Sequence, residues 1–237
     1  IHNAIKYPVT YIQGPPGTGK TNTIINTIAT AFFNERTVLF TSYNNHPIDS
    51  VFNVLNSLKY RDKTIPFPIL RLGNNEIIPE AIKYIKELYE ATKNMHIYEK
   101  TLSKNKEDKT EKTKQLTELL KKHEEIIDLN ERLETIENLI KLNNNMSFQL
   151  DLQCRQLDSV KKRLAEIGTV SDEDALNLLN DDTEAFYKYL YYVSAMYIKR
   201  LNEPKYVDFL NIIQMTDTEA QVEEFNRYLT DNENLKK

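Results

Sequence analysis

The chain has 237 residues, of which 40% are hydrophobic and 28% charged, enough to bury the core of one large domain or two small ones. Its single cysteine excludes a disulfide framework and a thiolate zinc site, and it predicts a reducing, cytoplasmic setting. No apolar run approaches the roughly 20 residues that cross a bilayer, so we expect no membrane partner. The chain does not begin with Met, which predicts that it is a piece of something longer.

The net charge of −4 is unevenly distributed. Residues 1–98 carry 10 basic and 7 acidic residues, residues 99–168 carry 14 of each, and residues 169–237 carry 7 and 14. A polyanion is attracted to positive potential. Any polyanion site is therefore expected in the N-terminal third, and the acidic C-terminal part is a poor candidate.

The first third alternates short β-prone runs with helical patterns. Residues 9–13, 37–41 and 69–72 are apolar or β-branched runs that predict strands. Apolar residues recur at helical spacing over about 20–33 and about 48–58. This order predicts an α/β fold with a parallel sheet.

After Pro79 the period changes, and neither Pro nor Gly occurs between residues 80 and 141. Residues 142–147 carry a turn signal, residues 150–167 form a second apolar stripe, and Gly168 follows it. The pattern predicts a helical hairpin with a coiled-coil stripe of about three heptads. Leucines and isoleucines form the first stripe: Leu119, Ile126, Leu129, Leu133, Ile136 and Ile140.

Acidic helices are expected at about 171–180, 182–202 and 218–229, with Ser171 capping the first. The middle helix is rich in tyrosine, and its spacing favours core packing over base stacking. We therefore predict three domains: 1–78 with the strands, 79–168 as the hairpin and 169–237 as an acidic helical subdomain.

Residues 14–21 read GPPGTGKT and fit the pattern G-x-x-x-x-G-K-[ST] at every fixed position, between a predicted strand and a predicted helix. Glycines let backbone N–H groups turn inward to form an anion cradle, Lys20 supplies a charge for the β- and γ-phosphates, and Thr21 offers a hydroxyl to Mg²⁺. This predicts an ATP or GTP site, with ATP favoured. The expected binding residues are Gln13, Gly14, Pro15, Pro16, Gly17, Thr18, Gly19, Lys20 and Thr21.

The chemistry of hydrolysis also needs an acid at the end of a second apolar strand, to hold Mg²⁺ through water. No apolar run after Leu72 ends in Asp-Glu. Either the chain stops before that strand or the protein binds nucleotide without turning it over, and we expect the first, with this chain alone inactive as an enzyme.

The loop and the segment that follows resemble a known family. IQGPPGTGKT, followed by VLFTSYNNHPIDSV, is similar to superfamily 1 helicases of the branch that contains senataxin and the nonsense-mediated-decay helicase. The positions that fit that branch's motif Ia are Thr41, Ser42, Asn45, Ile48 and Asp49. His46 and Pro47 depart from it, with Pro47 standing where Ala is usual, and residues 71–73 resemble an R-L-G that commonly ends the third strand. The resemblance covers about residues 4–73.

The resemblance implies an incomplete RecA-like domain of the P-loop NTPase class, interrupted by a large all-helical insertion. It implies an ATP-dependent helicase or translocase acting on single-stranded DNA or RNA, with Ser42 and Asn45 touching the nucleic-acid backbone. The remaining RecA-like domain would be a partner elsewhere in the parent chain. Asp49 is expected to orient the loop, and Arg71 meets either a phosphate or a surface carboxylate.

Three alternatives stay open. One is a chromosome-maintenance-type coiled-coil ATPase, whose phosphate loop would differ and which lacks motif Ia. Another is a nucleotide-gated interaction module with a helical arm and no turnover. An AAA+ protein is a weaker option, because its acid strand would be expected well before 160 further residues.

Overall fold

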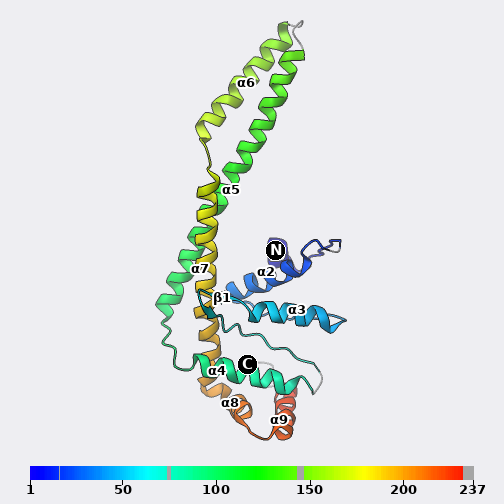
Figure 1. The fold of residues 1–237 in the computed structure, drawn as a ribbon, viewed down its shortest axis with the longest axis vertical. Helices are drawn as coiled ribbons and strands as arrows, with labels where there is room; N and C mark the ends of the chain where they lie inside the picture. Colours follow the sequence, from blue (N-terminus) through cyan, green and yellow to red (C-terminus); the bar gives the residue numbers. More distant parts are fainter. Residues whose placement is uncertain (16, 74–75, 143–146, 232–237) are drawn as a thin grey trace. The chain divides into compact units, whose positions relative to one another are not determined.

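A computed structural model describes residues 1–15, 17–73, 76–142 and 147–231 (Figure 1). They form two compact units, one from residues 1–105 and 187–237 and the other from residues 106–186. The elements, in chain order, are α1 (His2–Lys6), α2 (Lys20–Phe33), α3 (Asn45–Asn56), β1 (Lys59–Tyr60), β2 (Lys63–Thr64), α4 (Ile78–Thr92), α5 (Glu99–Leu142), α6 (Ser147–Ile167), α7 (Asp172–Lys199), η1 (Arg200–Asn202), η2 (Pro204–Tyr206), α8 (Val207–Gln214) and α9 (Thr218–Thr230).

In the first unit, α4, α8 and α9 enclose a hydrophobic cluster. Ile78, Ile82 and Ile85 recur at helical spacing along one face of α4 and pack with Ile213 and Phe225, both fully buried. Asp217 caps α9 by accepting hydrogen bonds from the backbone N–H groups of residues 219 and 220, at 3.0 and 3.1 Å. These three helices therefore share a closed core, and α9 begins where the sequence predicts.

The tyrosine-rich part of α7 packs inside the same unit. Tyr189, Leu190 and Val193 are buried, and the ring of Tyr189 meets that of Phe33 on α2 edge-on, with centroids 4.7 Å apart. The predicted core role of this stripe is confirmed.

The predicted parallel sheet is not present in the described residues, which are mostly helical. Segments 9–13, 37–41 and 69–72 form no strand ladder, and the pairing observed is a short antiparallel hairpin in which Lys59 faces Thr64 and Tyr60 faces Lys63. The N–H of Ile69 donates to the carbonyl of Phe67, two residues back, at 2.8 Å. A strand needs a neighbouring backbone to complete its hydrogen bonds, so a β-prone composition alone does not create one.

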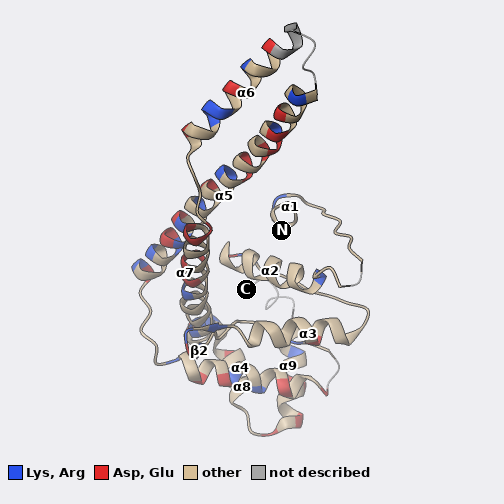
Figure 2. Ribbon diagram, turned by 45° about the horizontal axis from the view of Figure 1, so that its top comes forward, with Lys and Arg blue, Asp and Glu red and all other residues tan. Residues whose placement is uncertain are grey.

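The second unit contains the hairpin helices, which Figure 1 shows side by side. Arg163 on α6 pairs with Glu125 on α5 at 2.7 Å, and Lys161 pairs with Glu137 at 3.9 Å. Acidic and basic residues are interspersed along both helices (Figure 2). In the predicted stripe Leu129 is buried, and the other members of its two heptad series are partly buried. The predicted turn centres on residues 143–146, which lie outside the described residues.

Gly168 ends α6 with φ of 78°, and its N–H donates to the carbonyl of Leu164 at 3.1 Å, as expected for a helix terminus. Ser171 accepts a hydrogen bond from the N–H of Asp174 at 3.0 Å, which confirms the predicted cap.

One predicted helix boundary is wrong. The sequence suggested separate helices at 171–180 and 182–202, but α7 runs unbroken from Asp172 to Lys199. Asp182 accepts from the ammonium of Lys109 at 2.9 Å and from the hydroxyl of Thr113 at 2.7 Å, both on α5. The side chain of Asp182 therefore binds α5 and does not begin a separate helix. The predicted domain boundaries after residues 78 and 168 stay a prediction.

Candidate nucleotide-binding site

The glycine-rich loop leads directly into α2. Gly17 and Gly19 have φ of 82° and 76°, in the left-handed region that side chains other than glycine rarely adopt, and Gly19 is the residue before the first turn of α2. A Cβ on Gly14 would lie 2.6 Å from the hydroxyl of Thr18, which itself donates to the carbonyl of Pro15 at 2.8 Å. Gly17 and Gly19 are thus favoured by backbone conformation, and Gly14 by the close approach of the Thr18 hydroxyl.

Lys20 is the first residue of α2, and its side chain folds back over the loop. Its ammonium donates to the carbonyls of Gly14 and Pro15, both at 2.7 Å. An ammonium has three N–H donors, so these two bonds leave one for a phosphate oxygen among the contacts described. The loop therefore places a positive charge beside the helix N-terminus, where the first N–H groups of α2 have no intrahelical partner.

Thr21 is exposed in the first turn of α2, next to Lys20. This arrangement of flexible glycines, one lysine and a helix start fits the triphosphate of a nucleotide, and a hydroxyl oxygen fits Mg²⁺ as a ligand. In the described part of the chain, no group of three or more His, Cys, Asp or Glu side chains could hold a metal ion. Of the remaining predicted residues, Gln13, Pro15, Gly17 and Thr18 are exposed and Pro16 lies outside the described residues.

The predicted nucleic-acid residues lie on a different segment. Ser42 is exposed in the segment before α3, and Asn45 is the exposed first residue of α3. Arg71 donates from Nε to Oδ1 of Asp49 at 2.9 Å and from Nη2 to Oδ1 of Asn45 at 3.3 Å. The sequence left two roles open for Arg71, and the structure shows the one in which Arg71 pairs with a carboxylate. Sequence patterns do not connect residues 26 positions apart, so the contact between Arg71 and Asn45 could not be predicted. The sequence indicated only that Asn45 and Asp49 lie on the same face of a helix.

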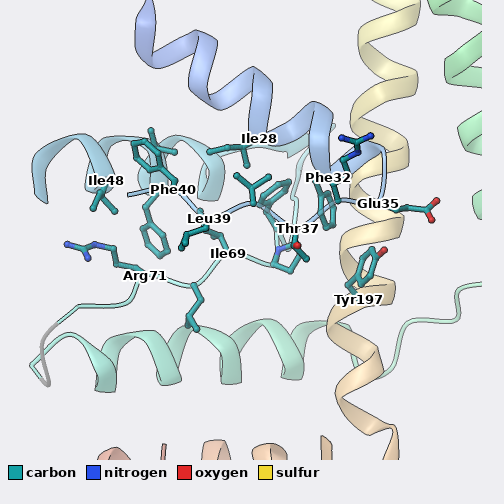
Figure 3. Close-up of a pocket in the computed structure, with 17 residues that line it drawn as sticks. Ile28, Phe32, Glu35, Thr37, Leu39, Phe40, Ile48, Ile69, Arg71 and Tyr197 are labelled. Atoms are coloured by element: carbon teal, nitrogen blue, oxygen red, sulfur yellow. The ribbon is translucent and has the colours of Figure 1, made fainter. Parts of the chain in front are cut away.

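A cavity of about 430 Å³ lies beside these residues, between α2, α3 and the extended segments around residues 37–40 and 67–71 (Figure 3). Its lining is largely apolar, with Ile28 and Phe32 from α2 and Leu39 and Ile69 from the extended segments. Figure 3 shows Arg71 and Tyr197 at its two ends. The sequence did not predict this cavity, because the extended segments among its walls were expected to be strands of a sheet.

Comparison with known proteins identifies the family. Residues 1–184 match the AAA_11 family, described as an AAA domain. The chain belongs to this AAA domain family. Such a domain implies nucleotide binding.

Two curated relatives that match part of the chain are named as helicases. Over 49 residues the chain is 45% identical to an uncharacterized ATP-dependent helicase of Mycoplasma genitalium and equally to its homologue in Mycoplasma pneumoniae. The match covers 21% of this chain and 4% of either relative. No solved structure matches the chain. The matches support a helicase-type ATPase family and do not reach the finer senataxin branch. Among the described residues no helix is both long and apolar enough to span a membrane.

Proposed function

We propose that the chain is the ATP-binding part of an ATP-dependent nucleic-acid helicase or translocase of superfamily 1, in the branch of senataxin and the nonsense-mediated-decay helicase. The observation that carries the proposal is the loop at residues 14–21, whose lysine ammonium lies 2.7 Å from two loop carbonyls at the start of α2. The family match and the helicase relatives support it.

In this proposal, the third N–H of Lys20 donates to a phosphate oxygen of ATP, while its bonds to the carbonyls of Gly14 and Pro15 hold the ammonium in place. Backbone N–H groups of the loop and of the first turn of α2 bind the same phosphates without side chains. Thr21 holds Mg²⁺, which neutralises charge on the β- and γ-phosphates when bound. The residues described here bind and orient the nucleotide, while the acid for hydrolysis and a second RecA-like domain come from elsewhere in the protein.

The nucleic-acid track of the proposed motor is single-stranded DNA or RNA. Ser42 and Asn45 contact its sugar-phosphate backbone through neutral hydrogen bonds, which fix position without reading sequence. Residues 1–98 carry more basic than acidic residues and therefore suit a polyanionic ligand, whereas the C-terminal part is acidic. One cysteine in 237 residues suits a cytoplasmic protein.

The test is Mg²⁺-ATP hydrolysis by the full-length protein, with and without single-stranded DNA and RNA. We expect one polymer to stimulate turnover strongly, and Lys20→Ala to abolish the stimulated rate. Lys6→Ala is the matched control, because it removes the same charge from an exposed lysine outside the loop. ATP binding with no turnover and no response to either polymer would reject the motor and favour a nucleotide-gated interaction module.

A further inference from the structure

We propose that Arg71 is a positioning residue that turns the side-chain amide of Asn45 outward, so that its NH₂ group donates to a phosphate of the single strand. The inference rests on the proposed function, since it gives Asn45 the nucleic-acid contact assigned there. It adds a residue from a distant segment, and it states how that residue acts.

The guanidinium of Arg71 already makes hydrogen bonds within the protein. Its guanidinium donates to Asp49 through Nε, to Asn45 through Nη2 and to the carbonyl of Leu72 through Nη1. Its side chain is 11% exposed, against 52% for that of Asp49. An arginine has five N–H donors, and three of them are used within the protein. Arg71 is therefore poorly placed to meet a phosphate directly, and it acts through its neighbours.

The donor chemistry fixes the orientation of Asn45. A guanidinium only donates, so the atom of Asn45 that faces it is the oxygen, Oδ1. The two N–H donors of the amide then point away from Arg71, on an exposed residue. Without Arg71 the amide can rotate by half a turn and present its oxygen outward, where a phosphate oxygen finds no donor.

Asp49 holds the guanidinium in place. It lies one helical turn after Asn45 on α3, so a single planar fork reaches both oxygens. Figure 3 shows Arg71 extending from its own segment towards α3, near Ile48. The ion pair also cancels the charge of Asp49, which would otherwise repel phosphate beside the contact.

The test is a mutant cycle at constant net charge. The four proteins are the wild type, Asn45→Ala, the pair replacement Arg71→Met with Asp49→Asn, and the triple variant. Binding of a fluorescent single-stranded oligonucleotide is measured by anisotropy, in DNA and RNA forms, at one fixed salt concentration. Binding of a fluorescent ATP analogue and the thermal midpoint are measured on the same samples.

We expect Asn45→Ala and the pair replacement each to weaken oligonucleotide binding by about 5- to 10-fold, which is the scale of one hydrogen bond. The triple variant is expected to bind like Asn45→Ala alone, because the pair acts only through that amide. Binding of the ATP analogue should change less than about twofold, whereas a general structural defect would weaken both ligands.

The conservative variant Arg71→Lys keeps the charge but lacks the fork. It can reach one oxygen at a time, so an intermediate loss of about two- to threefold is expected. Arg36→Lys is the matched control: Arg36 donates to the carbonyl of Ile5 at 3.0 Å, and no change is expected there. If the pair replacement does not fold, Arg71→Lys carries the test, and full affinity in that variant would overturn the inference.

The outcomes separate this inference from the proposed function. A wild-type protein that binds ATP but neither oligonucleotide overturns both the nucleic-acid role and the positioning role. Loss in Asn45→Ala with wild-type affinity in the pair replacement overturns the positioning role alone. Additive losses in the triple variant also overturn it, because they would mean that the pair acts independently of Asn45.

Discussion

Two regions of the first unit differ in how far their apolar side chains are buried. In the cluster of α4, α8 and α9, Phe225 and Ile213 are fully buried and Ile82 is 1% exposed. In the extended segment of residues 37–41, Leu39 is 89% exposed and Val38 46%. Both regions are similarly rich in branched apolar residues, so composition does not explain the difference.

The difference lies in where the backbone hydrogen bonds go. A helix completes its bonds within itself and can then dock its apolar face against another helix. An extended segment leaves its N–H and C=O groups to a neighbouring strand, and residues 37–41 have no such neighbour among the described residues. The closed core should therefore carry stability, while the extended segment contributes little.

The largest expected effect comes from breaking the closed core. Phe225→Ala should lower the free energy of unfolding by about 3–5 kcal/mol, because it leaves a cavity among three helices. Leu39→Ala is the matched comparison and should change it by less than about 0.5 kcal/mol, because the side chain is already in water. Urea unfolding followed by circular dichroism measures both.

Equal losses in the two variants would contradict the comparison, since they would mean that Leu39 is as well packed as Phe225. A small loss in Phe225→Ala would mean that the α4, α8 and α9 cluster does not form a cooperative core.

A smaller effect on stability is expected from a hydrogen bond that a tyrosine on α4 donates. Tyr84 on α4 donates its hydroxyl to Oδ1 of Asn56 at 2.6 Å and lies 3.1 Å from the carbonyl of Phe67, so it links α4 to the end of α3 and to the extended segment around residue 67. Tyr84→Phe should cost about 1 kcal/mol at neutral pH, the usual net value of a lost hydrogen bond. Urea unfolding at pH 7 measures it.

The same residue predicts a dependence on pH. Burial raises the pKa of Tyr84 to about 12, from 10.0. The folded state then keeps its proton longer than the unfolded state does, so this contribution to stability is complete below pH 10 and is lost as the pH rises towards 12. The decline should be shallower in Tyr84→Phe, with a remainder from Tyr189, whose pKa burial also raises to about 12. An unchanged slope would exclude Tyr84 as a source.

The features that could be predicted from the sequence are those settled by neighbouring residues. The phosphate loop, the cap at Ser171, Gly168 and the start of α9 each depend on a few consecutive side chains. Predictions failed where the local structure depends on residues that are distant in the sequence. The β-prone segment at 37–41 pairs with no strand among the described residues, and α7 continues past Asp182, whose carboxylate accepts hydrogen bonds from Lys109 and Thr113 on α5.

The candidate site divides in the same way. Lys20 and its glycines lie within one short stretch, so their pattern could be recognised directly. The bond from Arg71 to Asn45 joins two segments that no motif spacing connects, and only the folded chain brings them together.

The central claim is that the loop at residues 14–21 binds ATP, and equilibrium binding of ATP to this chain tests it most directly. The wild type should bind ATP in the presence of Mg²⁺, Lys20→Ala should bind roughly 10- to 100-fold more weakly, and Lys6→Ala should bind like the wild type. Equal affinity in the wild type and Lys20→Ala, or no binding by a folded wild type, would contradict the account.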